Sequence, residues 1–259
     1  MGQGLLRAAP GFSQLLVSGA VTWPGSLALG RDAGEVAGIG RMNLPVTSDL
    51  PAAIASADVV LDFSNRAATA ATLAACRAAR KPLLLGTTGF GTELDAELDA
   101  TAREVALLVA PNTSVGAALL GELTRVAAAA LPAGFDVDVL ELHHRLKQDA
   151  PSGTALALAD IAARARGLEP PAAGRSGLAG DPGGPRAEGQ VGLASLRAGD
   201  IVGEHTVLFC GAGEELSLTH RAHDRGVFAR GALSAALWLS SRPPGRYNMR
   251  DFVLPKTEG

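Results

Sequence analysis

The sequence contains little of what marks several common classes of protein. Its two cysteines, Cys76 and Cys210, form no C-x-x-C pair, so neither a disulfide framework nor a zinc site is indicated. The formal net charge of -3 provides no basic surface for nucleic acid or an anionic membrane. No apolar run approaches the roughly 18 residues that a membrane span needs, and no basic segment followed by an apolar core opens the chain. We therefore expect a cytoplasmic protein without a metal site and without nucleic-acid or membrane partners.

The first half of the chain contains a regular alternation of apolar runs and helical segments. Apolar runs lie at 57–61, 82–85 and 105–110, and the segments between them have helical periodicity. Strands that alternate with helices at this spacing indicate a parallel sheet wound on both faces. Ahead of them, the sequence predicts a short helix over 1–9 and a strand over 14–21.

Glycine-rich or polar loops follow all three of these predicted strands. They cover residues 62–65, 86–90 and 110–114 and carry glycine, hydroxyl or amide groups. Ligands bind at the carboxyl ends of the strands in parallel sheets of this kind. One such loop alone is explained by a tight turn, whereas three on one predicted edge favour a binding site.

The second half of the chain has a different pattern. A helix is predicted over 115–131, and it leads into a second domain. Strands that alternate apolar with polar residues are predicted at 191–197, 204–210 and 215–220. That alternation is typical of antiparallel strands with one exposed face, a surface that often packs on a partner subunit. Residues 167–190 are rich in glycine and proline and predict a long irregular loop, and a helix over 229–240 returns to the first domain.

One stretch near the middle of the chain holds most of its reactive side chains. Alternation predicts a strand that ends at 141–144, and Ser152 is a suitable N-cap for a helix that starts at about Gly153. The loop between them brings two histidines and Lys147 close to the free N–H groups of a helix start, which is a pocket for an anion. Any one of these side chains alone would be an ordinary exposed residue. Their convergence favours a functional site.

The same stretch matches a known signature at every fixed position. Residues 141–155 read E-L-H-H-R-L-K-Q-D-A-P-S-G-T-A. They resemble the active-site signature of the 4-hydroxy-tetrahydrodipicolinate reductase family, formerly called dihydrodipicolinate reductase, E-x-H-H-x-x-K-x-D-x-P-S-G-T-A. Further segments that resemble the family lie at 62–63, 86–90, 112–116, 197–200, 203–206 and 225–229. The resemblance therefore extends over nearly the whole chain.

The resemblance implies a fold and a reaction. The fold class is α/β, with a Rossmann-like, doubly wound parallel cofactor domain at 1–113 and 225–259. An α+β domain at 114–224, with a mixed or antiparallel sheet, would bind substrate and form a homotetramer. The reaction would be the nicotinamide-dependent reduction of dehydrated 4-hydroxy-tetrahydrodipicolinate, a small dicarboxylate, to tetrahydrodipicolinate in the diaminopimelate route to lysine.

The resemblance also implies roles for individual residues. His143 would be the general acid or base, Lys147 the second proton donor, and His144 a contact to the substrate. The N–H groups of Gly153 and Thr154 would hold a substrate carboxylate. These roles agree with the chemistry, because imidazole transfers protons near neutral pH and a cation beside a helix start suits a dianion. The positions expected to bind the cofactor are Gly2, Thr22, Trp23, Gly86, Thr87, Thr88, Ala110, Pro111, Asn112, Thr113, Arg225 and Phe228.

The chain departs from the family at its start. Family members open with a strand and a turn, G-x-x-G-R-M-G, whose N–H groups cradle the cofactor pyrophosphate. Here Met1-Gly2 aligns with the last M-G of that turn, so the sheet is expected to lack its first strand. Our hypothesis is a start codon assigned too far downstream, which an in-frame stop codon directly upstream would contradict. A chain that truly lacks these residues should bind the cofactor weakly.

A second departure follows the predicted strand at 14–21. Many dinucleotide domains place an acidic residue there to bind the ribose 2′-hydroxyl, but this chain has Thr22-Trp23. No carboxylate repels a 2′-phosphate at this position, and no arginine is adjacent to bind one, since Arg31 lies further along. We therefore expect NADPH or NADH as cofactor, with weak discrimination and some tolerance for NADPH.

Two alternatives remain beside this reductase. Another amino-acid dehydrogenase of the same architecture is the nearer one, although two adjacent histidines followed by Lys147 speak against it. The other is a truncated, weakly active or inactive homologue that has lost the glycine turn. A panel of substrates separates the first alternative from the reductase, and an equilibrium titration with NADPH separates the second.

Overall fold

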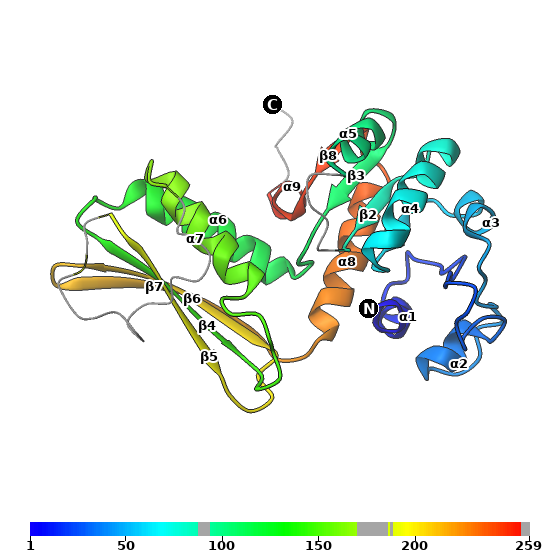
Figure 1. Ribbon diagram of the computed structural model, residues 1–259, viewed down its shortest axis with the longest axis horizontal. Coiled ribbons are helices and arrows are strands. Elements are labelled where there is room, and N and C mark those ends of the chain that lie inside the picture. The colour runs from blue at the N-terminus through cyan, green and yellow to red at the C-terminus, as the bar shows by residue number, and fades with distance from the viewer. Residues whose placement is uncertain (88–93, 170–185, 187–188, 255–259) are drawn as a thin grey trace. The chain divides into compact units, whose positions relative to one another are not determined.

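The computed structural model describes residues 1–87, 94–169, 186 and 189–254 of the chain (Figure 1). The chain forms two compact units, Met1–Val115 with Gly226–Gly259, and Gly116–Arg225. The predicted domain limits differ from these by one or two residues. Thr88 and most of the predicted loop at 167–190 lie outside the described residues. Within the described part, no helix is both long and apolar enough to cross a membrane.

The first unit contains the predicted parallel sheet. Its strands have the order β1-β2-β3-β8 and all run parallel. They are β1 (Val60–Asp62), β2 (Leu83–Leu85), β3 (Ala106–Val109) and β8 (Gly245–Tyr247). The apolar runs predicted the first three. The sequence did not predict β8, because Gly-Arg-Tyr carries neither an apolar run nor an alternating pattern.

Helices cover both faces of this sheet, as its apolar strands require. They are α4 (Arg66–Ala79), α5 (Asp95–Glu104) and α8 (Gly226–Leu239). One core cluster contains Leu83, Leu85 and Leu107 of the strands with Leu73 of α4 and Leu98 of α5. Leu84 and Leu108 alternate with these residues, so they point to the opposite face. Both are fully buried, and α8 packs against all three of these strands.

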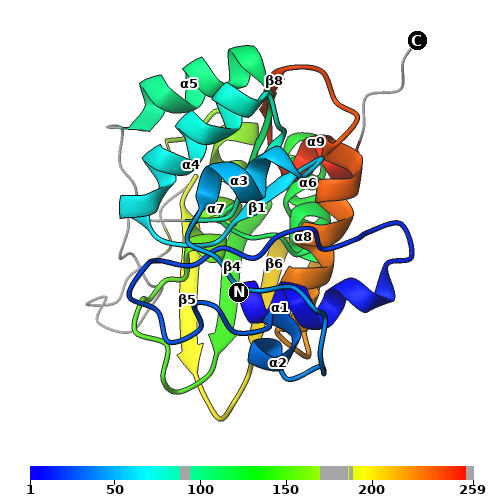
Figure 2. The same cartoon turned by 90° about the vertical axis from the view of Figure 1, so that its right-hand side faces the viewer.

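Shorter helices complete the first unit. They are α1 (Gly2–Ala8), the 3-10 helix η1 (Ala9–Gly11), α2 (Ala33–Ala37), α3 (Leu50–Ala55) and α9 (Met249–Val253). Asp32, Asp49 and Asn248 accept backbone N–H groups at the starts of α2, α3 and α9, which satisfies donors that a helix start otherwise leaves unpaired. Figure 2 shows α1 beside α8 and α2, and α1 packs against both. The predicted N-terminal helix is therefore confirmed.

The strand predicted over 14–21 was wrong. In this segment, a single bridge joins Val21 to Thr47, and Leu16 is 88% exposed. A strand is stabilised by hydrogen bonds to a neighbouring strand along its length. This segment lies against no strand of the described sheet, so its apolar residues are not enough to form one.

The second unit is a helix-covered mixed sheet of order β5-β4-β6-β7. Its strands are β4 (Asp136–His143), β5 (Val191–Arg197), β6 (Gly203–Gly211) and β7 (Glu214–Ala222). The strands β6 and β7 are antiparallel, as predicted, but β5 runs parallel to β4. The prediction of β5 as antiparallel was wrong, because α7 (Gly153–Ala165) separates β4 from β5, and a helical crossover connects parallel strands.

The two faces of this mixed sheet differ. The inner face packs Val139, Val207 and Phe209 against Leu158 and Ala162 of α7 in one core cluster. The helix α6 (Val115–Ala130) adds to the same cluster. Among the described residues, both long helices of this unit pack in the inner-face cluster, and the outer-face side chains are partly exposed along β4 and β6.

Candidate functional site

The buried face of β4 changes character toward the carboxyl end of the strand. Val137, Val139, Glu141 and His143 alternate along it and are all buried. Glu141 is 0% exposed and His143 is 8% exposed. The face of β4 that buries two valines thus also buries a carboxyl and an imidazole. Because an unpaired buried charge is costly, these two side chains need partners.

Glu141 has a partner on every side. Arg197 at the end of β5 donates two hydrogen bonds to its carboxylate, Nη2 to Oε1 at 2.8 Å and Nη1 to Oε2 at 3.0 Å. The backbone N–H of Ser152 donates to Oε1 at 3.2 Å, and Nδ1 of His143 contacts Oε2. Parallel pairing brings Arg197 beside His143 in register. One carboxylate thereby joins the ends of two strands to the start of α7.

These contacts set the protonation states of the pair. Burial alone would raise the pKa of Glu141, but hydrogen bonds from Arg197 and His143 outweigh it, so the pKa is lowered. Burial lowers the pKa of His143, and the opposing attraction of Glu141 does not restore it. Near neutral pH the site therefore holds a carboxylate beside a neutral imidazole.

A third buried side chain, His205 of β6, lies next to this pair. Its ring is 5.2 Å from that of His143 and nearly perpendicular to it. Nε2 of His205 is 3.1 Å from Oγ of Ser152, and that oxygen also accepts the N–H of Ala155 as the N-cap of α7. Burial, together with the neighbouring His143, lowers the pKa of His205 to about 4. The predicted cap at Ser152 is confirmed.

Lys147 lies in the turn after β4. Its Nζ is 2.8 Å from Oδ1 of Asp149, and this contact lowers the pKa of Asp149. The backbone N–H of Lys147 donates to the carbonyl of His144 at 3.1 Å. Lys147 therefore lies in the short turn that begins at His144, and its ammonium group is paired with Asp149 within that turn.

His144, the residue after the buried His143, contacts an arginine. Nη2 of Arg225 is 3.1 Å from its Nε2. Arg225 was predicted to bind the cofactor and His144 to bind the substrate, and the structure places the two side chains in contact. Both roles stay predictions. Gly153 and Thr154 form the first turn of α7, where N–H groups have no acceptor within the helix.

In the first unit, the carboxyl ends of the strands come together as predicted. The N–H of Gly86 donates to the carbonyl of Asp62 at 2.8 Å, and the N–H of Ala110 donates to that of Leu85 at 2.9 Å. The hydroxyl of Thr87 is 3.4 Å from Oδ1 of Asp62. The other oxygen of Asp62, Oδ2, is buried with no hydrogen-bond partner among the described residues. This edge can therefore accept a donor such as an amide or a sugar hydroxyl, which fits part of a dinucleotide.

The remaining predicted cofactor residues fall into two groups. Oγ1 of Thr113 donates to the carbonyl of Phe228 at 2.7 Å, and between Pro111 and Ser114 the side chain of Asn112 accepts the N–H of Ser114 at 2.9 Å. Gly2, Thr22 and Trp23 belong to the N-terminal segments of the first unit. Gly2 begins α1, the N–H of Thr22 donates to Thr47, and Trp23 is 68% exposed.

Three donors at the end of β4 have the spacing of a metal site. Glu141, His143 and His205 offer ligand atoms within 4.8 Å of one another. Arg197, however, already binds both oxygens of the carboxylate, and its positive charge would repel a metal cation there. The donor set therefore fits an ion pair better than a metal, and the absence of a metal stays a prediction.

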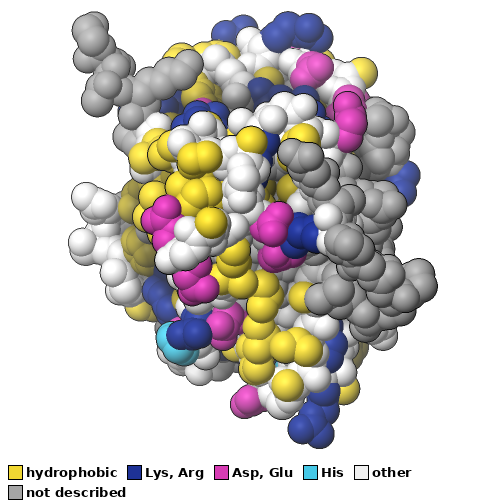
Figure 3. Space-filling view, turned by 90° about the vertical axis from the view of Figure 1, so that its left-hand side faces the viewer, with side chains coloured by type: hydrophobic (Ala, Val, Ile, Leu, Met, Phe, Trp, Pro, Cys, Tyr) yellow, Lys and Arg dark blue, Asp and Glu magenta, His cyan; other side chains and the backbone are white. Residues whose placement is uncertain are grey.

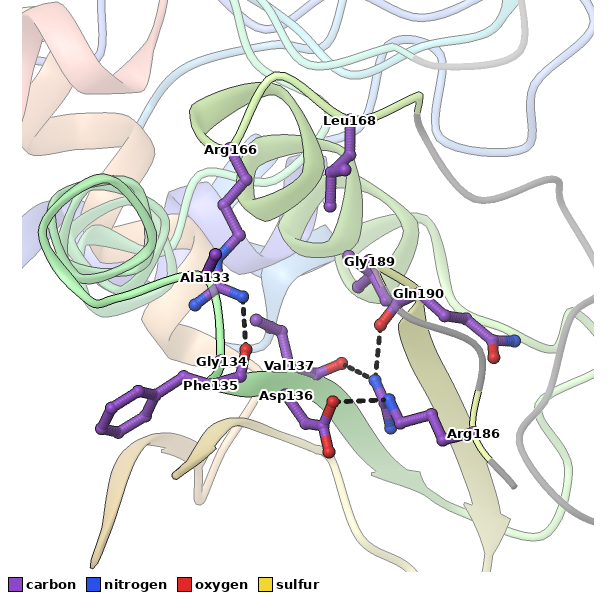
Figure 4. A pocket seen from close by; sticks show the side chains of 11 residues that line it. Ala133, Gly134, Phe135, Asp136, Val137, Arg166, Leu168, Arg186, Gly189 and Gln190 are labelled. Atoms are coloured by element: carbon purple, nitrogen blue, oxygen red, sulfur yellow. Dashed lines mark hydrogen bonds and ion pairs between the residues drawn. The ribbon is translucent and has the colours of Figure 1, made fainter. Parts of the chain in front are cut away.

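A separate pocket lies at the opposite end of β4 (Figure 4). Figure 4 shows Arg166 and Arg186 turned toward backbone oxygens and acidic side chains of this region. Arg166 donates to the carbonyl of Phe135 at 2.5 Å, and Arg186 pairs with Asp136 at 3.2 Å and with Asp138 at 2.8 Å. Arg186 is thus already paired, and none of the predicted site residues lines this pocket.

The sequence did not single out three members of the site, Glu141, Arg197 and His205. Each lies in a segment that resembles the family, and this was the available signal. A local pattern cannot show that Arg197 reaches Glu141, because the two residues are far apart in the chain and meet through strand pairing.

Comparisons with known proteins cover nearly the whole chain. A family model described as "Dihydrodipicolinate reductase, N-terminus" matches residues 1–113, and one described as "Dihydrodipicolinate reductase, C-terminus" matches residues 116–253. A 4-hydroxy-tetrahydrodipicolinate reductase of Anaeromyxobacter dehalogenans is 47% identical, over 96% of this chain and 91% of its own length. One from Alkalilimnicola ehrlichii is also 47% identical, over 98% and 94%.

Solved structures show the same fold. A dipicolinate-bound dihydrodipicolinate reductase from a Paenisporosarcina species has a TM-score of 0.75 at 24% identity, covering 98% of this chain and 95% of its own. An amine dehydrogenase from Mycobacterium smegmatis has a TM-score of 0.55 at 13% identity, covering 90% and 88%. The predicted α/β fold, a Rossmann-like unit plus a unit with a mixed sheet, is confirmed.

Proposed function

Because the chain belongs to the dihydrodipicolinate reductase family, we propose that it reduces dehydrated 4-hydroxy-tetrahydrodipicolinate to tetrahydrodipicolinate with NADPH or NADH. This reaction belongs to the diaminopimelate route to lysine. The observation that carries the proposal is the cluster at the end of β4, in which a buried, carboxylate-paired His143 lies at the end of the strand that leads to Lys147 and the start of α7. The relatives named for this activity are similar over almost the whole chain.

The reaction adds one hydride and one proton to a conjugated system of double bonds. A bound nicotinamide supplies the hydride to one carbon, and the neighbouring atom then needs a proton. Burial lowers the pKa of His143, so its protonated form is a stronger acid than a free imidazolium and gives up its proton readily. Lys147 is the second donor. His143 and Lys147 are thus the proposed donors of the proton that the substrate takes up, and this step requires no metal.

The substrate is a dianion, and the surroundings of His143 carry matching positive groups. Lys147 and Arg225 carry formal positive charges, and His144 is hydrogen-bonded to Arg225. The first turn of α7, at Gly153 and Thr154, offers backbone N–H groups and the positive end of a helix dipole. A carboxylate at the helix start and a second one near Lys147 would place the ring of the substrate beside His143.

The cofactor would bind at the carboxyl ends of β1, β2 and β3. Its support is the convergence of Gly86, Thr87 and Ala110 on one edge together with the unpaired buried oxygen of Asp62. Thr22-Trp23 leaves the 2′-position without a carboxylate. We therefore expect the ratio of kcat/KM for NADPH and NADH to stay within about tenfold, and a strong preference for NADH would contradict this.

The outer face of the mixed sheet is the proposed tetramer interface. Apolar side chains that are partly exposed on it are Leu140, Leu142, Ala194, Leu196 and Leu208. Figure 3 shows one face of the molecule, on which hydrophobic side chains lie next to acidic and basic ones. The proposed protein is a cytoplasmic homotetramer. Light scattering should give the molar mass of a tetramer for the wild type and a smaller molar mass for Leu140→Glu. A wild-type monomer would contradict the assembly.

The activity is tested by following oxidation of NADPH with 4-hydroxy-tetrahydrodipicolinate as substrate. Wild type should turn over, and His143→Ala should lose about 100-fold or more of kcat. The matched control is His223→Ala, an exposed histidine of the same unit, which should keep wild-type kcat. Absence of turnover in wild type, with saturable NADPH binding, would remove the proposed substrate.

A further inference from the structure

The carboxylate of Glu141 is surrounded by hydrogen-bond donors. Oε1 receives bonds from Nη2 of Arg197 and from the backbone N–H of Ser152. Oε2 receives one from Nη1 of Arg197 and contacts Nδ1 of His143. The guanidinium and the backbone N–H can only donate. Their positions therefore hold the carboxylate in one orientation, with Oε2 presented to the imidazole.

The neighbour on Nδ1 determines which nitrogen of His143 carries the proton. An ionised carboxylate can only accept, so the contact to Oε2 requires a proton on Nδ1 of the neutral imidazole. Nε2 then carries the lone pair. On that side, Gly203 has no side chain, and a Cβ there would lie 3.0 Å from Nε2. A side chain at Gly203 would therefore crowd the reactive nitrogen.

We propose that Glu141, oriented by Arg197 and by the N–H of Ser152, is a positioning residue that holds His143 with a proton on Nδ1, so that Nε2 takes up a proton from solvent and passes it to the substrate. The carboxylate stabilises the imidazolium that exists between these two transfers. This inference rests on the proposed function for the role of His143. Glu141 itself is fully buried behind the imidazole, so it acts through His143 and does not contact the substrate.

Glu141→Gln is the informative substitution, because it keeps the shape and removes the charge. The amide oxygen should turn to Arg197 and to the backbone N–H of Ser152, because both groups can only donate. The amide NH2 then faces Nδ1, which must become an acceptor, and the proton moves to Nε2. The imidazolium that gives its proton to the substrate carries N–H on both nitrogens, so it is disfavoured beside the NH2 group. A comparable carboxylate-to-amide change beside a catalytic histidine reduces kcat by about 10,000-fold through the wrong tautomer.

The experiment combines imidazole nitrogen-15 NMR of His143 with steady-state kinetics on the full chain. Wild type should show the tautomer protonated at Nδ1. Glu141→Gln should show the other tautomer, with kcat lower by about 100-fold or more and KM for the substrate within about threefold. Glu141→Asp keeps the charge and should recover the wild-type tautomer and part of the lost kcat.

The pH profile of kcat adds a readout that a structural role would not move. The charged or titratable groups close to His143 are Glu141, Lys147, Arg197 and His205. Removing the one negative charge among them should move the limb that reports His143 to lower pH in Glu141→Gln. The control is Glu204→Gln on β6, whose carboxylate pairs with Arg221 at 2.8 Å and points to the outer face. It should change neither tautomer nor kcat.

The outcomes separate this inference from the proposed function. An unchanged His143 tautomer in Glu141→Gln, or a kcat within threefold of wild type, overturns the positioning role. If wild type reduces no substrate, the proposed function fails, and the tautomer of His143 in the two variants alone decides whether Glu141 positions it. Should Glu141→Gln fold poorly, Arg197→Lys provides the NMR comparison, because it removes one of the two hydrogen bonds that orient the carboxylate. A mixture of the two tautomers is expected, and a wild-type spectrum overturns the positioning role.

Discussion

The two predicted binding regions lie at equivalent places in their sheets but are lined by different kinds of group. Both lie at the carboxyl ends of strands, at β1, β2 and β3 in one unit and at β4 and β5 in the other. The first edge consists mainly of backbone groups and small residues such as Gly86 and Thr87. The second consists of buried ionisable side chains, Glu141, His143 and Arg197, that bind one another. Under the proposed roles, cofactor binding depends on backbone shape, whereas proton transfer depends on charge.

The largest expected effect tests whether chemistry is confined to the second region. Lys147→Ala removes a proton donor and should lower kcat by about 100- to 10,000-fold. Cofactor affinity should stay within about twofold, because the lysine belongs to the substrate side. Steady-state kinetics and an NADPH titration measure both. Lys81→Ala, in the other unit, is the control with wild-type kcat. A large loss of NADPH affinity in Lys147→Ala would break the separation between the two regions.

The next effect is on stability. Arg197→Ala leaves the fully buried carboxylate of Glu141 without its cation and should reduce the free energy of unfolding by about 3–5 kcal/mol. Arg221→Ala breaks an ion pair of the same kind on the outer face, where the arginine side chain is 60% exposed, and should cost far less. Denaturant unfolding of both variants beside wild type measures the difference. Equal losses would show that burial of the Glu141–Arg197 pair has no special weight.

The third effect is a pH dependence of stability centred on His205. Burial lowers its pKa from 6.5 to about 4, so the unfolded chain binds a proton more readily than the folded chain. Its contribution to stability is complete above pH 6.5 and is lost as the pH falls toward 4. The loss should reach about 3 kcal/mol at most. Unfolding measured across this range should be steeper for wild type than for His205→Gln, and parallel curves would contradict the assignment.

The smallest effect tests the backbone-built region. A Cβ on Gly86 would lie 2.0 Å from Cε1 of Phe63, so Gly86→Ala must displace the ring and should cost about 1–3 kcal/mol. NADPH affinity should fall while kcat at saturating cofactor changes little. Gly11→Ala, where a Cβ meets nothing within 4 Å, is the control. Unchanged NADPH affinity in Gly86→Ala would remove this edge from the cofactor site.

The sequence predicted those features of each region that depend on residues close together in the chain. Apolar runs indicated β1, β2 and β3, and Ser152 indicated the start of α7, because burial and capping depend on neighbours in the chain. The strand over 14–21 was wrong and β5 was assigned the wrong direction, because both depend on which strand lies alongside. The Glu141–Arg197 pair was missed for the same reason.

By itself, then, the sequence determined the identity of the reactive groups, the periodicity that buries them and the family to which they belong. The tertiary structure decided how those groups are charged and oriented. Parallel pairing of β4 with β5 brings Arg197 to Glu141, and antiparallel pairing of β4 with β6 brings His205 to His143. A pKa or a tautomer depends on groups within a few ångströms in space, and residues far apart in the chain reach that distance only when the sheet forms.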